Sequence, residues 1–154
     1  MTTKDQKIRD AIKVECDRQH VGEDRQEMLY QAYISVRPDA VLPLHAAFLM
    51  NIAAAIEPHN RGRFRTTPVS FNGIVGGVPP ENIERAMENW IKWYNSGLLA
   101  RLSLRETLVD VVIKEFLDIH PFIDGNGRTA WLLRVWMLNQ WDDPQPLPDY
   151  YKEG

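Results

Sequence analysis

The chain has a single cysteine, Cys16, in 154 residues. With no second cysteine, an intrachain disulfide is excluded, and the reducing cytoplasm is the default location. The sequence also lacks any apolar run near the ~20 residues that a membrane-spanning helix needs, and its charged beginning does not resemble a signal peptide. We therefore expect a cytoplasmic protein with no membrane partner, or a protein of a host cytoplasm if secretion delivers it there.

Positive charge is not in excess, because 18 lysines and arginines face 21 acidic residues and leave a net charge of −3. This balance gives no general attraction for nucleic acid, so no nucleic-acid partner is expected. His20, His45 and His59 share no metal-ligand spacing with one another or with Cys16, which argues against a structural zinc site. Hydrophobic residues at 44% and charged residues at 25% are ordinary for one compact globular domain of this length.

The apolar pattern predicts a mainly α protein. Helices are expected over residues 4–20, 23–34 and 42–56, with a break near Gly22. Residues 62–78 change to an alternating pattern around Asn72-Gly73, a strong hairpin signal. A further helix follows Pro79-Pro80, and its core face is expected to hold Ile83, Met87, Trp90, Ile91 and Tyr94.

Two core helices are expected near the end of the chain. The first has an apolar stripe and a capping box, Ser103 with Glu106, and the second is a strongly apolar run that begins near Asn126. The stripe consists of Leu104, Leu108, Val111, Val112, Phe116 and Ile119. Residues 142–154 contain three prolines and are expected to form an irregular surface arm.

The junction between these two helices carries unusual chemistry, with the sequence His120-Pro-Phe-Ile-Asp124-Gly-Asn-Gly-Arg128. A helix N-terminus attracts anions, and Gly125 and Gly127 allow a phosphate to approach the main chain. Asp124 makes sense beside phosphates if a divalent cation lies between them, and a neutral histidine is a natural proton acceptor. The alternative is a plain turn, but a turn does not require His120, Phe122 and Arg128 together.

This nine-residue stretch resembles the signature of the Fic (filamentation induced by cyclic AMP) family, His-x-Phe-x-Asp/Glu-Gly-Asn-Gly-Arg-x-x-Arg. The resemblance spans about residues 40–140 and includes Arg63-Phe64-Arg65, Val69 to Gly77, Pro79-Pro80 and Trp93-Tyr94-Asn95. It implies a Fic-fold helical bundle with a small β-hairpin flap before the central helices. Residues 1–39 would be N-terminal helices packed on the core, residues 40–141 the Fic core and residues 142–154 the tail.

The resemblance implies a protein adenylyltransferase that moves AMP from ATP to a Ser, Thr or Tyr hydroxyl of a target protein. His120 would deprotonate the hydroxyl, and Asp124 would hold Mg²⁺ between the α- and β-phosphates. Gly125, Asn126 and Gly127 would form the anion hole, and Arg128 would neutralise charge on the phosphates as pyrophosphate leaves.

The hairpin would dock an extended segment of the target by β-augmentation. The docking residues would be Thr67, Pro68, Val69, Ser70, Phe71 and Asn72. The alternative is an edge hairpin that only covers the core. Arg61, Arg63 and Arg65 form either a solvated face or a patch that steers charged partners.

The chain departs from the family pattern at Trp131, where a second arginine is expected. In the family that arginine is associated with the γ-phosphate and with an inhibitory glutamate, so a different ATP pose or another donor nucleotide stays open. Trp131 is either a core residue, like Trp90, Trp93 and Trp136, or a platform for the base. Arg134 is offset on the helix and is not expected to substitute.

No inhibitory Ser/Thr-x-x-x-Glu-Gly/Asn segment is evident in the sequence. The nearest match, residues 53–58 with Glu57, is interpreted as an ordinary helix terminus. We therefore expect either constitutive activity or restraint by a separate, antitoxin-like protein. Two alternatives to AMP transfer remain: a Doc-type protein kinase, against which Gly125 and Gly127 count, and a catalytically impaired binding module of a toxin–antitoxin pair.

Overall fold

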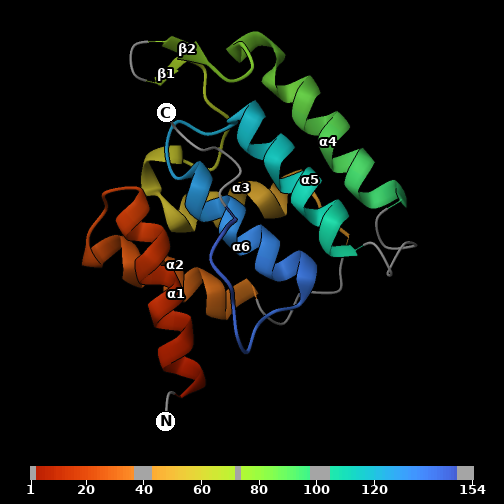
Figure 1. Ribbon diagram of the computed structural model, residues 1–154. Helices are drawn as coiled ribbons and strands as arrows, with labels where there is room; N and C mark the ends of the chain where they lie inside the picture. The colour runs from red at the N-terminus through yellow and green to blue at the C-terminus, as the bar shows by residue number, and fades with distance from the viewer. Residues whose placement is uncertain (1–2, 37–42, 72–73, 98–104, 149–154) are drawn as a thin grey trace.

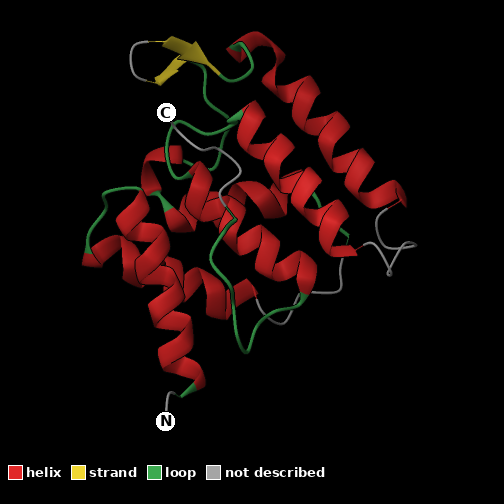
Figure 2. Cartoon of the chain, in the orientation of Figure 1, coloured by secondary structure: helices red, strands yellow, loops and turns green. Residues whose placement is uncertain are grey.

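The computed structural model describes residues 3–36, 43–71, 74–97 and 105–148. Within them lie six α-helices and one small hairpin (Figures 1 and 2). The helices are α1 (Lys4–Arg18), α2 (Glu23–Val36), α3 (Ala46–Ile56), α4 (Ile83–Gly97), α5 (Arg105–Ile119) and α6 (Asn126–Leu138), with short 3₁₀ helices η2 (Pro58–Asn60) and η3 (Pro80–Asn82). The mainly α expectation is confirmed.

Helix α6 is the centre of the molecule and contacts α1, α2, α3 and α5 (Figure 1). Of its 13 residues, 11 are buried. A helix buried around its whole circumference belongs to the interior of a bundle, which explains why its sequence shows no polar face. The motif therefore ends at the most enclosed helix of the fold.

Helix α4 shows the opposite pattern, with one apolar stripe facing α3 and α5. Ile83, Met87, Trp90 and Tyr94 are buried, as expected, and Ile91 is half-buried. Trp93 lies off the stripe and is 45% exposed, so its assignment to the core was wrong. Val111 of α5 is likewise 49% exposed, because that helix buries Val109, Val112 and Phe116 instead.

The third helix begins four residues later than expected. Asn95 of α4 accepts a hydrogen bond from Leu44 N (3.0 Å) and donates one to Leu44 O (2.8 Å), which fixes Leu44 outside the helix. Pro43 consequently precedes α3 rather than lying in its first turn.

The hairpin consists of strands β1 (Val69–Phe71) and β2 (Ile74–Gly76), paired antiparallel. It lies at the same end of the molecule as the loop that joins α5 to α6 (Figure 1). The expected turn at Asn72-Gly73, the Ser103 cap and residue Leu104 fall outside the described residues.

The chain after α6 is irregular through residue 148, as expected, but part of it packs into the fold. Leu147 is only 7% exposed, its N–H donates to Glu15 Oε1 (2.8 Å), and its carbonyl accepts from Arg18 (2.9 Å). The expectation of a surface arm was therefore wrong for this stretch.

Candidate active site

The loop of residues 120–125 connects the end of α5 to the start of α6 and is closed by Asn126. Asn126 Oδ1 accepts from Phe122 N (3.0 Å) and Asn126 Nδ2 donates to Phe122 O (2.8 Å), and the side chain is buried. Phe122 is fully buried between Phe64 and Phe116. The amide and the ring together fix the loop from the inside.

His120 lies directly after α5, with φ 55 in the left-handed region. Its N–H still completes the helix by donating to Phe116 O (3.0 Å), and its carbonyl accepts from Arg65 Nε (2.6 Å). Burial first, and then the nearby charge of Arg65, lower the pKa of His120 to about 4, against the opposing effects of the Leu117 backbone and Asp124. The imidazole is therefore neutral at neutral pH and able to accept a proton.

Asp124 is the exposed acid of the loop, with 57% of its side chain accessible. Its Oδ1 accepts from Gly125 N at 2.7 Å and lies 3.7 Å from Arg128 Nη2. Mg²⁺ commonly takes one or two protein carboxylates and completes its shell with waters and substrate phosphates, so a single exposed Asp124 fits that role.

Gly125 is the N-cap of α6 with φ 76, and no side chain caps this helix. A Cβ at Gly125 would lie 3.0 Å from Glu57 Cβ and 3.3 Å from Arg128 Nη2, so both dihedral and space call for glycine. Uncapped first-turn N–H groups attract anions.

Arg128 does not face solvent in this structure. It is fully buried, Nη2 contacts Glu57 Oε1 at 3.2 Å, and Nε donates to Gln19 Oε1 at 3.1 Å. A third contact goes to Ile56 O at 3.4 Å. The guanidinium expected at the phosphates is thus occupied by groups of the protein itself.

Glu57 is the partner that the sequence did not reveal. It does form the C-cap of α3, as a helix terminus would, but it is also 2% exposed and pairs with Arg25 (2.8 Å) as well as Arg128. Burial alone would raise the pKa of Glu57, but hydrogen bonds from Arg25, His59 N–H and Arg128 outweigh it and hold the pKa below its usual value. No spacing in the sequence links residues 25, 57 and 128, which meet only through the fold.

Gln19, the residue that follows α1, covers the start of α6. A Cβ built on Gly127 would lie only 2.6 Å from Gln19 Nε2, which shows how closely this amide packs on the glycine. The Cα of Gly127 is therefore covered by a side chain of the chain's own N-terminal part, next to the N–H groups that a phosphate would use.

The hairpin residues are accessible where the structure describes their side chains. Thr67, Pro68 and Ser70 are exposed and Val69 is half-buried, while Phe71 is described as backbone only and Asn72 lies outside the described residues. The described sheet holds only β1 and β2, so each has a free edge.

Trp131 is a core residue. It is fully buried, stacks on Tyr33 at 5.8 Å between ring centroids, and donates from Nε1 to Gln145 O (3.0 Å). In this structure it cannot reach a nucleotide base, so the base-stacking alternative was wrong. Arg134 points elsewhere and pairs with Asp110 at 2.8 Å.

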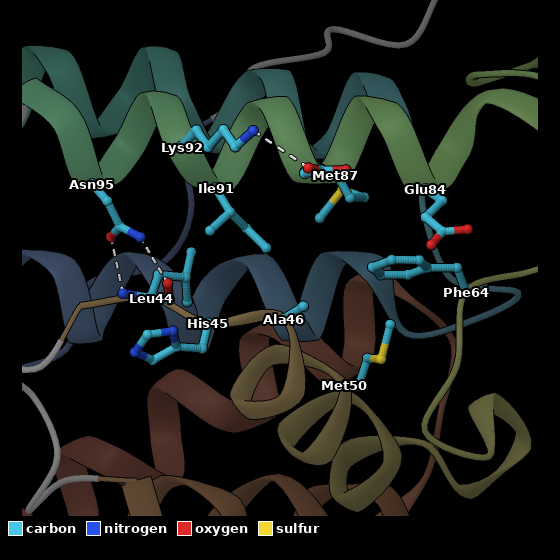
Figure 3. Close-up of a pocket in the computed structure, with 11 residues that line it drawn as sticks. Leu44, His45, Ala46, Met50, Phe64, Glu84, Met87, Ile91, Lys92 and Asn95 are labelled. Carbon is cyan, nitrogen blue, oxygen red and sulfur yellow. Dashed lines mark hydrogen bonds and ion pairs between the residues drawn. The ribbon is translucent and has the colours of Figure 1, made fainter.

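A separate hollow of about 390 Å³ lies between α3 and α4 and is lined largely by apolar side chains such as Met50, Met87 and Ile91 (Figure 3). Among the described residues that line it, Phe64 also contacts Phe122 of the loop. His45 and Asn95 lie at its far end (Figure 3).

No group of three or more His, Cys, Asp or Glu side chains able to hold a metal by themselves occurs among the residues described. None of the described helices combines the length and the apolarity needed to cross a bilayer.

Comparison with known proteins identifies the relatives of this fold. The sequence model described as "Fic/DOC family" matches residues 33–138. "Protein adenylyltransferase fic-1" of Caenorhabditis elegans is 31% identical over 122 residues, covering 79% of this chain and 23% of the relative. "Protein adenylyltransferase Fic" of Nematostella vectensis is 31% identical over 130 residues, 80% of this chain and 29% of the relative. The chain thus spans less than a third of these two relatives.

Solved structures share the fold at low identity. "IbpAFic2 covalently tethered to Cdc42" aligns with a TM-score of 0.72 and 18% identity, covering 94% of this chain and 50% of that one. A Fic-domain signalling protein from Bacteroides thetaiotaomicron aligns with a TM-score of 0.65 and 24% identity, covering 76% and 48%.

Proposed function

Since this chain belongs to the Fic/DOC family, we propose that it is an adenylyltransferase that moves AMP from ATP to a Ser, Thr or Tyr hydroxyl of a target protein. The observation that carries the proposal is one loop with a neutral histidine at one end and an uncapped helix N-terminus at the other. Relatives that carry the name protein adenylyltransferase support the same reaction.

In the proposed reaction the target's hydroxyl oxygen attacks the α-phosphorus of ATP. The new P–O bond forms as the bond to the β-phosphate bridging oxygen breaks, so the products are the adenylylated protein and pyrophosphate. The hydroxyl proton passes to the His120 imidazole, which is neutral beforehand. Positioning and charge stabilisation do most of the work in such transfers.

The phosphates would lie at the first turn of α6, against the N–H groups of Gly125, Asn126 and Gly127. Mg²⁺ would be held by the exposed Asp124 and would supply charge neutralisation at the phosphates. The side-chain amide of Asn126 shapes the loop instead of donating to the anion. Arg128 would contact the phosphates only after its hydrogen bonds to Glu57 and Gln19 break. In this structure those bonds hold the start of α6 against the rest of the fold.

The target would align along the hairpin, from Thr67 to Asn72, with its backbone paired to a free strand edge. One structural neighbour is tethered to Cdc42, a protein, which supports a protein as the acceptor here.

A second candidate is a catalytically impaired binding module of a toxin–antitoxin pair, with a separate antitoxin-like protein as its partner. The observation in its favour is the cover that Gln19 places over Gly127, together with Trp131 where the family pattern has an arginine. A module of this kind would bind partners without transferring a nucleotide group.

ATP labelled at the α or the γ position, incubated with the protein, Mg²⁺ and cell lysate, separates the candidates. Label from the α position on protein supports AMP transfer, label from the γ position indicates a Doc-type kinase, and no label favours the binding module. His120→Ala should abolish the α label, while the matched control His45→Ala, at an exposed histidine in the α3–α4 hollow, should retain it.

A further inference from the structure

Arg65 is a buried guanidinium whose hydrogen bonds all go to main-chain carbonyls. It is 5% exposed, and no ion pair to a carboxylate is found for it among the described residues. Burial lowers the pKa of Arg65. From the sequence, Arg65 was expected to join Arg61 and Arg63 in a solvated face or a patch that steers charged partners. This expectation is wrong for Arg65, because Arg61 and Arg63 are exposed and Arg65 is buried.

The carbonyls come from both ends of the hairpin and from the end of α5. Arg65 Nη1 donates to Thr67 O (2.8 Å), and Nη2 donates to Val78 O (2.5 Å). Nε donates to His120 O (2.6 Å), with a longer contact from Nη2 to Ile119 O (3.4 Å). One side chain thus ties the entry and exit of the hairpin to the residue that carries the imidazole.

Main-chain bonds and a glycine complete this junction. Arg65 N donates to Pro121 O (2.9 Å) and Val78 N to Ile119 O (3.1 Å). Gly77 has φ 72, and a Cβ there would lie 2.8 Å from Arg65 Nη2 and 3.1 Å from His120 Cβ. Gly77, Arg65 and His120 are therefore closely packed, and a side chain larger than that of glycine would not fit between them without a shift.

The backbone of His120 needs such support. A non-glycine residue in the left-handed region is strained by the contact of its Cβ with the following carbonyl, and φ 55 places His120 there. The bond from Arg65 to the His120 carbonyl is charge-assisted and buried, which makes it one of the stronger kinds. The left-handed backbone of His120 sets the direction in which its imidazole leaves the chain. A contact that fixes this backbone therefore also helps to fix the position of the proton acceptor.

We propose that Arg65 is a positioning residue that sets the backbone of His120 and the base of the hairpin as one unit, so that proton acceptor and docked target keep a fixed relation. This inference rests on the proposed AMP transfer for its functional meaning. Arg65 touches no reacting atom and acts only through His120 and the hairpin.

Electrostatics gives the proposal a readout beyond stability. The charged groups that act on the His120 imidazole are Arg65, which lowers its pKa, and Asp124, which raises it. Replacing Arg65 by a neutral residue should therefore move the His120 pKa upward. Lysine keeps the charge but lacks the planar fork that reaches several carbonyls at once.

The test compares Arg65→Gln and Arg65→Lys with Arg85→Gln, an exposed arginine of α4. The first readout is the His120 imidazole pKa by NMR titration, assigned with His120→Ala, which needs no enzymatic activity. The second is α-label transfer, split into kcat and the KM for ATP.

We expect Arg65→Gln to raise the His120 pKa and to lower kcat by about 100-fold with little change in KM, the scale that a small misplacement of reacting groups produces. Arg65→Lys should keep a low His120 pKa but still lose kcat, and Arg85→Gln should match wild type. Folded Arg65 variants with wild-type titration and kcat would overturn the proposal.

Gly77→Ala is a second variant, because its Cβ would press on both Arg65 and His120. If both Arg65 variants unfold, the proposal stands only if Gly77→Ala stays folded and has a lower kcat than wild type. If no protein in the series transfers label, the proposed reaction fails, but the titration still decides whether Arg65 controls His120.

Discussion

Glu57 and Arg128 form a buried ion pair, with Oε1 and Nη2 3.2 Å apart and both side chains at most 2% exposed. The pair links the end of α3 to the first turn of the central helix. Arg25 of α2 and Gln19, the residue after α1, also contact the pair. Residues of α2 and α6 and the ends of α1 and α3 therefore meet at this point. The pair therefore stabilises the loop on which the candidate chemistry depends.

Glu57→Gln should destabilise the fold strongly. Removing one partner of a buried ion pair leaves an uncompensated charge, which typically costs about 3–5 kcal/mol. Chemical denaturation should show a lower midpoint with an unchanged slope. Glu84→Gln, at an exposed glutamate of α4, is the control and should leave the midpoint in place; an equal midpoint for both variants would mean that the pair contributes nothing.

The same pair predicts how stability depends on pH. The folded pKa of Glu57 lies below its ordinary 4.5, so its stabilising effect is complete above pH 4.5 and is lost as pH falls through the folded value. Denaturation midpoints measured from pH 6 downward should therefore fall less steeply in Glu57→Gln than in wild type. Parallel curves would contradict the low pKa.

His120 makes a separate prediction about activity. Because its folded pKa is lowered to about 4, the imidazole stays neutral as pH falls below 6.5 and is protonated only near the lower value. The acid limb of the kcat/KM profile for transfer, which reports the pKa values of the free protein, should lie well below pH 6.5. An acid limb at 6.5 would show that His120 is not held in the buried, Arg65-facing environment described above.

Gln19→Ala should uncover the start of α6. The change removes the amide packed on Gly127 and leaves Arg128 Nε without its acceptor, a loss of about 1–3 kcal/mol for a buried donor. We expect a lower melting temperature together with tighter ATP binding, measured by calorimetry. Gln31→Ala, at an exposed glutamine, controls for surface effects; weaker ATP binding in Gln19→Ala would argue against a covering role.

Asp124→Asn should remove the dependence of nucleotide binding on Mg²⁺. The carboxylate is exposed, so the fold should be little affected. The control is Asp143→Asn, at another exposed aspartate. The ATP affinity measured with Mg²⁺ should differ from that measured with EDTA in wild type and in the control, but not in Asp124→Asn. A full Mg²⁺ effect in Asp124→Asn would place the metal elsewhere.

Several features that one helix decides by itself were predicted from the sequence. The periodicity of Ile83, Met87 and Trp90 predicted the buried stripe of α4, and the motif predicted that α6 begins at Asn126. Such features follow from 3.6-residue spacing and turn chemistry, which are local.

Features that depend on distant contacts could not be predicted in this way. Arg65 looks no different from Arg63 until the hairpin and α5 enclose it, and Glu57 has the appearance of a helix end until α2 and α6 bring Arg25 and Arg128 to it. The sequence therefore pointed to the loop that leads into α6, while the contacts of Arg65, Glu57 and Gln19 with it became apparent only in the fold.

The binding of ATP at the start of α6 is best tested by a crystal structure with Mg²⁺ and a non-hydrolysable ATP analogue. We expect phosphates against the N–H groups of Gly125 to Gly127, a cation at Asp124, and Gln19 displaced from Gly127. An analogue bound in the hollow between α3 and α4, with Gln19 still packed on Gly127, would contradict it.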